Sequence, residues 1–134
     1  MTPLEGWLNF GITIALADGT ITDEESLSIS DFAEDATGMS AAQVQRHVNA
    51  HRRGDGPSLK AISAAIEGTD QAQALGFLKL CYTIASADDD EHPKEEEMLR
   101  HIAAAVFGAA AADTVLRYLH LTGQADRIAE QLLA

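Results

Sequence analysis

The chain has 134 residues, of which 46% are hydrophobic, which is enough for one domain with a buried core. Its formal net charge of −12 argues against direct binding to nucleic acid or an anionic membrane, and favours cations or a protein partner. The chain has no run of about 18 apolar residues and no basic start typical of a signal peptide, so we expect a cytoplasmic protein without a transmembrane segment.

The first predicted element is a helix that begins at Thr2-Pro3, because proline is tolerated in the first turn of a helix. Residues 4–16 are apolar nearly all round this helix, which is typical of a central helix. The acidic segment ADGTITDEE (17–25) follows, and apolar residues spaced by three or four then predict an amphipathic helix over 29–36. A capping box of Ser40 and Gln43 opens the next helix, which runs toward His51.

In the second half, Ser58 to Glu67 is predicted to be a short helix, and Thr69 or Asp70 can cap an apolar helix that ends near 87. The acidic segment ADDDEHPKEEE (87–97) leads into an amphipathic helix over 99–106. Two closing helices are predicted, 113–121 and 124–133, on either side of Gly123. No alternating run of β-branched residues indicates a sheet. We therefore predict one all-α domain over 1–134, a bundle of about seven to eight helices.

An internal repeat is indicated when the sequence is shifted by 70 residues. Residues 6–42 and 76–112 then share twelve identities in 37 positions without a gap. The matched positions include the Asp, Glu and Gly residues at the ends of the predicted helices. Each copy is predicted to be a helix, an acidic loop and a second helix, with the repeats covering about 4–42 and 74–112. The alternative is a coincidence between two amphipathic helix pairs.

The first acidic segment resembles the second half of a calcium-binding EF-hand loop. Asp18 and Glu25 match the fifth and twelfth ligand positions, but Ile14 and Leu16 occupy the first and third and cannot bind a cation. A structural explanation is equally available, because Thr22 and Glu25 can form a capping box for the following helix. Helix capping and cation binding therefore both remain open.

If a cation binds, it is expected to use carboxylates of both acidic segments. Oxygen ligands suit a hard divalent ion such as calcium, magnesium or manganese. The four consecutive acids at 88–91 add repulsion that water, a cation or a basic partner would have to relieve. The candidate metal ligands are Asp18, Glu25, Asp88, Asp89, Asp90 and Glu95.

The other candidate reactive groups favour structural interpretations. The one cysteine, Cys81, lies in an apolar run and is predicted to be buried and unreactive. His47 and His51 have a spacing that suits zinc on a helix, but two solvent-exposed histidines are the favoured interpretation because a third ligand is not evident. No nucleophile–base pair and no phosphate-binding glycine loop is present, so we predict no catalytic residues, no bound cofactor and no enzymatic activity.

The pattern A-x-A-D-G-x-I-x-x-x-E, followed by an amphipathic helix and given twice, resembles the TerB-like family. That family includes the tellurite-resistance protein TerB and the N-terminal domain of the DjlA co-chaperones. The resemblance covers about residues 8–36 and 75–108, and the second copy departs from the pattern at Asp89 and Glu91. It implies an all-helical domain in stress and metal-resistance systems, with acidic residues as metal-chelating positions and no established catalytic activity. We therefore expect a non-enzymatic domain in tellurite or metal stress response that binds a divalent cation or a protein partner through its acidic segments. The alternative is a structural interaction module whose acids only cap helices and solvate the surface.

Overall fold

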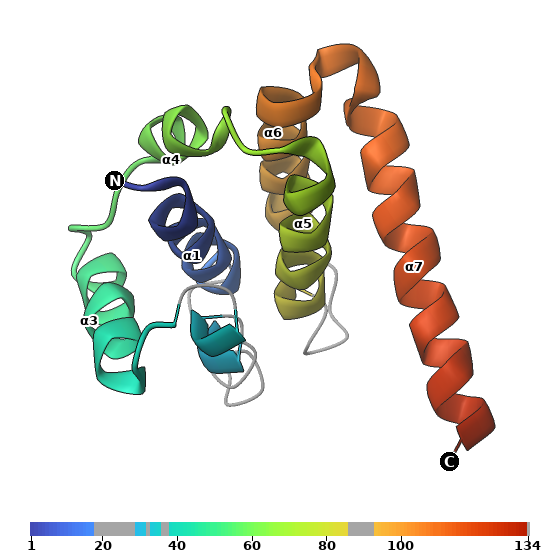
Figure 1. The fold of residues 1–134 in the computed structure, drawn as a ribbon, viewed down its shortest axis with the longest axis horizontal. Coiled ribbons are helices and arrows are strands. Elements are labelled where there is room, and N and C mark those ends of the chain that lie inside the picture. Colours follow the sequence, from blue (N-terminus) through green and yellow to red (C-terminus); the bar gives the residue numbers. More distant parts are fainter. Residues whose placement is uncertain (18–28, 32, 36–37, 86–92, 134) are drawn as a thin grey trace.

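The computed structural model describes residues 1–17, 29–31, 33–35, 38–85 and 93–133, and in these residues all regular structure is helical (Figure 1). Residues 29–31 and 33–35 are helical as well. The prediction of an all-α fold with about seven to eight helices is confirmed. The remaining elements are α1 (Pro3–Ala15), α3 (Ala41–Arg52), α4 (Leu59–Ile66), α5 (Gln71–Ala85), α6 (Pro93–Phe107), the 3₁₀ helix η1 (Ala109–Ala111) and α7 (Ala112–Leu133).

Local capping explains where four helices begin. The side chain of Thr2 accepts the backbone N–H of Glu5 and Pro3 opens α1, as predicted. Ser40 and Gln43 form the predicted capping box of α3. Each cap satisfies a backbone N–H that has no partner inside its own helix. The other two caps are Ser58 at α4 and Asp70 at α5.

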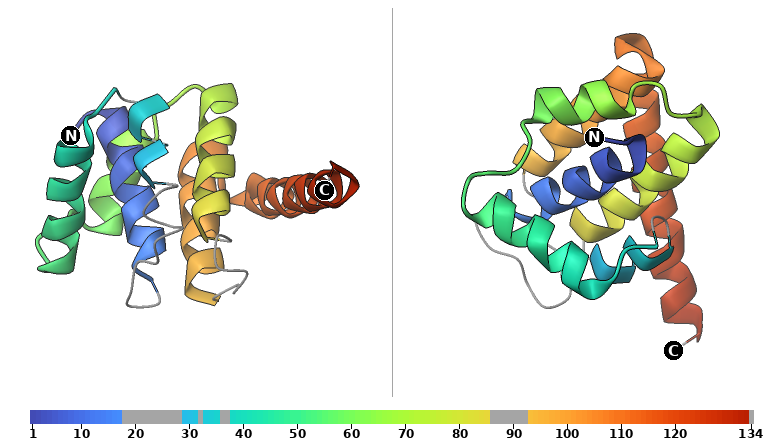
Figure 2. Two further views of the ribbon diagram at one scale, coloured as in Figure 1. Left: turned by 90° about the horizontal axis from the view of Figure 1, so that it is seen from below. Right: turned by 60° about the vertical axis from the view of Figure 1, so that its left-hand side comes forward.

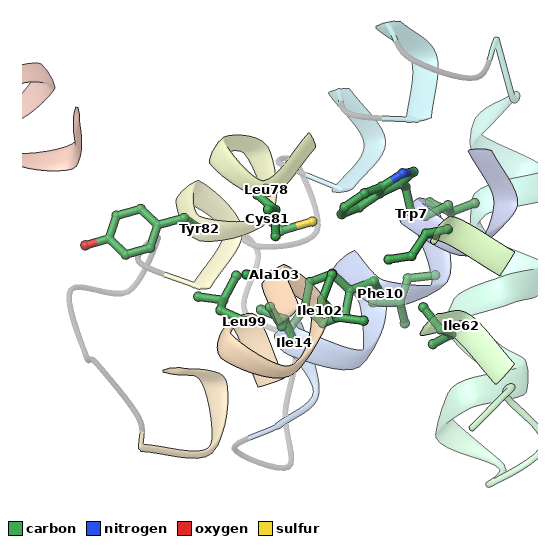
Figure 3. Close-up of a cluster of buried hydrophobic side chains, with 14 of the residues drawn as sticks. Trp7, Phe10, Ile14, Ile62, Leu78, Cys81, Tyr82, Leu99, Ile102 and Ala103 are labelled. Carbon is green, nitrogen blue, oxygen red and sulfur yellow. The ribbon is translucent and has the colours of Figure 1, made fainter. Parts of the chain in front are cut away.

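Helix α1 is the centre of the bundle, and α3, α4 and α5 all pack against it. Its side chains from Trp7 to Ile14 are almost all buried, as its continuous apolar run predicts. Figure 3 shows side chains of α1, α4, α5 and α6 converging on one core. Cys81 is part of this core and is fully buried, and burial raises the pKa of its thiol, so the prediction of a structural cysteine is confirmed.

The prediction of two closing helices separated at Gly123 is wrong, because α7 runs without interruption from Ala112 to Leu133 (Figure 2). The glycine serves packing instead of a helix break. A Cβ atom at Gly123 would lie 2.8 Å from Cε1 of Tyr82, which is buried between α5 and α7. The Tyr82 hydroxyl also lies 3.2 Å from Nδ1 of His120, so the same contact region attaches α7 to α5.

Several observations bear on the internal repeat. Helices α1 and α5 end at Ala15 and Ala85, which are 70 residues apart, and these two helices pack together. Gly38 and Gly108, also 70 apart, both have positive φ, at +69° and +92°. Gly108 directly follows α6. The superposition of the two halves stays a prediction, because much of the second helix of the first copy lies outside the described residues.

In the described part of the chain, no helix is both long enough and apolar enough to cross a membrane.

Candidate functional site

Five of the six candidate metal ligands lie outside the described residues. These are Asp18, Glu25, Asp88, Asp89 and Asp90. The sixth, Glu95, is the third residue of α6 and is 3% exposed. Over the ranges that the structure describes, no group of three or more His, Cys, Asp or Glu side chains could hold a metal ion.

Glu95 is unusual because carboxylates are seldom fully buried. A buried carboxylate needs hydrogen bonds or an opposite charge to offset the loss of its hydration. Its place in the first turn of α6 supplies part of this, since backbone N–H groups and the helix dipole favour a negative charge there. The same position is where the sequence pattern places a cation ligand. Its burial therefore distinguishes Glu95 from the exposed carboxylates of the described residues, whether it stabilises the start of α6 or binds a cation.

An open pocket of about 380 Å³ lies where the last turn of α1, the end of α3 and the first turn of α6 meet. Ala17, which lines the pocket, directly precedes Asp18 of the first acidic segment. Lys94, which also lines it, belongs to the second acidic segment and follows Pro93, where the described chain resumes. The two acidic segments therefore adjoin the same pocket along the chain. Its lining residues are Thr13, Leu16, Ala17, His51, Lys94, Glu97 and Met98.

His51 lines the pocket, and its ring is bonded to the buried side chain of Asn9. Asn9 is 3% exposed, and its Nδ2 donates to the backbone oxygen of Glu5 at 2.8 Å. Its Oδ1 is then the acceptor for Nε2 of His51, 2.9 Å away, which assigns the proton of the neutral ring to Nε2. Burial lowers the pKa of His51, and the charge of nearby His47 lowers it further. His51 therefore presents a neutral ring.

The interpretation of two solvent-exposed histidines is wrong, because His47 and His51 are both partly buried and His51 is bonded to Asn9. The sequence signal for this pair was weak, because Asn9 lies within an apolar helix and 42 residues from its partner. The packing of α3 on α1 brings the two side chains together.

The polar groups of the pocket suit binding better than covalent catalysis. The hydroxyl of Thr13 donates to the backbone oxygen of Asn9 at 2.8 Å, and the Nε2 proton of His51 is held by the same residue. Neither group is arranged as a nucleophile with an adjacent base. Lys94 and Glu97 place both signs of charge on the exposed side of the pocket. The arrangement offers mixed polar contacts beside an apolar wall formed by Leu16 and Met98.

The fold and the pocket define an all-α domain with a pocket of mixed polar and apolar lining. A family model described as tellurite resistance protein TerB matches residues 6–116. The chain belongs to this TerB family, which confirms the resemblance seen in the sequence. No curated protein and no solved structure matches the chain significantly.

Proposed function

We propose that this TerB domain is a non-enzymatic binding protein in tellurite or metal stress response. It binds a divalent cation or a protein partner through the acidic segments at 17–25 and 87–97. The observation that carries the proposal is the buried carboxylate of Glu95 in the first turn of α6. Membership of the TerB family supports the pathway. The lining of one pocket by Ala17 from the first segment and by Lys94 and Glu97 from the second supports a common site.

The physical argument for a cation starts from charge. The chain carries 21 acidic and 9 basic residues, and the acids are concentrated in the two segments. Carboxylates gathered at one site raise one another's pKa and destabilise the native state unless a cation or a basic partner compensates. Hard divalent ions prefer such oxygen ligands, and a site assembled from two segments needs the folded domain.

The competing function is a structural interaction module in which the acids only cap helices. This alternative accounts for the place of Glu95 in the first turn, because the helix dipole stabilises a carboxylate there without an ion. It does not by itself account for the burial of that carboxylate, which favours the proposal. The two functions differ in one measurable property. At constant ionic strength, a cation site makes the melting temperature rise with the concentration of the divalent ion, whereas helix capping does not.

The experiment is a calorimetric titration of the full chain with calcium, magnesium and manganese, together with melting curves at increasing ion concentration. Asp18→Asn, Asp88→Asn and Glu95→Gln should each weaken binding and reduce the ion-dependent rise. Glu67→Gln is the matched control, because it removes one negative charge at the exposed end of α4. Absence of binding heat at millimolar ion, with equal melting temperatures, would leave the structural module as the function.

A further inference from the structure

Helix α7 has two apolar faces. The first is packed in the core and consists of the buried residues Ala112, Val115, Leu116 and Leu119. The second, here called the α7 stripe, consists of the exposed residues Tyr118, Leu121, Ala125, Ile128 and Leu132. With 3.6 residues per turn, the centres of the two faces lie roughly 150° apart around the helix. The α7 stripe therefore points away from the core that α7 helps to form.

The exposure of the α7 stripe is large. Leu121 is 56% exposed, Ile128 57% and Leu132 80%. The C-terminal part of α7 also extends beyond the rest of the bundle (Figures 1 and 2). A continuous row of exposed apolar side chains is typical of a surface that binds another element. The family match ends at residue 116, so the α7 stripe lies in a part of the chain that the family model does not cover.

The spacing of the α7 stripe specifies the kind of element that fits it. Successive members are separated by three, four, three and four residues, which is the a/d repeat of a coiled coil over two heptads. Such a seam takes the knobs of another helix with the same repeat. Helix α7 itself has that repeat, so a second copy of this chain provides a matching helix.

The charge beside the seam favours a second copy as well. Two copies of a chain with net charge −12 repel each other over most of their surface. The positions that flank the seam contain no acidic residue, so two copies meet the least repulsion there. These flanking residues are Arg117, Thr122, Gln124, Ala129 and Gln131.

We propose that the α7 stripe is a dimerisation surface on which the α7 helices of two copies pack in antiparallel orientation. This orientation sets a positions against d positions, with Leu121 of one copy opposite Leu132 of the other. Ala125 then lies opposite Ile128, so a small side chain faces a large one. The two acidic bundles are placed at opposite ends of the seam, whereas a parallel arrangement would bring them side by side.

The first test is the mass of the full chain in solution by sedimentation equilibrium. The wild type should have the mass of a dimer, and Ile128→Asp should halve it, because the substitution buries a charge in the seam. Ile128 is exposed in the single chain, so the variant should keep its helical circular dichroism and its melting curve at low concentration. Leu4→Asp is the control, since Leu4 is 41% exposed at the start of α1 and should leave the dimer intact.

The second test determines the orientation by disulfide cross-linking. Leu121→Cys and Leu132→Cys variants are mixed and oxidised, and Cys81 does not interfere because it is fully buried. The antiparallel seam predicts a mixed disulfide between the two variants and little cross-linking of either alone. Disulfides within each single variant would show a parallel seam and overturn the proposed orientation.

Two further outcomes would overturn the dimer. One is a wild-type monomer up to millimolar protein, with a hydrophobic dye that binds the wild type but not Ile128→Asp. That result would assign the α7 stripe to a different protein or to another segment of a longer chain. The other is a dimer whose mass is unchanged by Ile128→Asp, which would place its interface elsewhere.

Discussion

Trp7 and Phe77 stack on each other, with ring centroids 5.3 Å apart and an interplanar angle of 22°. They are 70 residues apart, so they match each other in the predicted repeat. One belongs to α1 and the other to α5, the two apolar helices that pack together. Nε1 of Trp7 also donates to the hydroxyl of Thr69 at 3.2 Å, which satisfies the only polar atom of this fully buried side chain.

Trp7→Ala should lower the free energy of unfolding by about 3–5 kcal/mol, because it removes a fully buried aromatic ring and leaves a cavity. Urea unfolding followed by circular dichroism measures this, since Trp7 is the one tryptophan of the chain. Phe77→Ala should lower stability less, because Phe77 is only partly buried. Equal losses for the two variants would contradict the central position of α1.

Gly6 and Gly76 match each other in the predicted repeat but should respond to alanine in opposite directions. A Cβ atom at Gly6 would lie 2.7 Å from Cγ2 of Ile66, a fully buried side chain of α4. Gly6→Ala should therefore lower the free energy of unfolding by about 1–3 kcal/mol through overpacking.

A Cβ atom at Gly76 has nothing within 4 Å. Because alanine has the higher helix propensity, Gly76→Ala should raise the free energy of unfolding by about 0.5–1 kcal/mol. The two variants form a matched pair in urea unfolding experiments. Stabilisation by both would show that α1 and α4 are not in close contact at Gly6.

His51 should make the protein less stable as the pH falls. Burial lowers its pKa in the native state, so below the ordinary histidine value of about 6.5 the unfolded chain binds a proton that native His51 resists. The free energy of unfolding then decreases as the pH falls from that value toward the native pKa, and the effect is absent at higher pH.

His51→Gln keeps an N–H group for Asn9 but does not titrate, so its stability should fall less steeply below pH ~6.5 than that of the wild type. The measurement is urea unfolding at a series of pH values. His101→Gln is the control, because His101 is an exposed histidine of α6. Identical pH profiles for His51→Gln and the wild type would contradict the buried pair.

Cys81 should not react with a thiol reagent in the native protein. Its side chain is fully buried and burial raises its pKa, so neither access nor thiolate is available. The reaction followed by absorbance should therefore proceed only as the core opens, and it should become fast in denaturant. Rapid labelling of the native chain would show that the core around α5 is open.

Much of the fold and part of the site followed from the sequence. The apolar spacing and the capping residues at Thr2, Ser40 and Ser58 predicted where helices begin, because these effects depend on neighbours within one or two turns. Of the candidate ligands, only Glu95 lies among the described residues, and its burial was not evident from the sequence. The other five stay predictions.

The sequence by itself determined the all-α class, the acidic charge and most helix starts, because local periodicity and capping carry that information. Tertiary structure decided the rest. The contact of Tyr82 with Gly123 shows why a glycine lies inside an unbroken α7, and the contact with Asn9 holds the ring of His51, which lines the pocket. Both contacts join residues about 40 positions apart, and only the packing of whole helices brings such residues together.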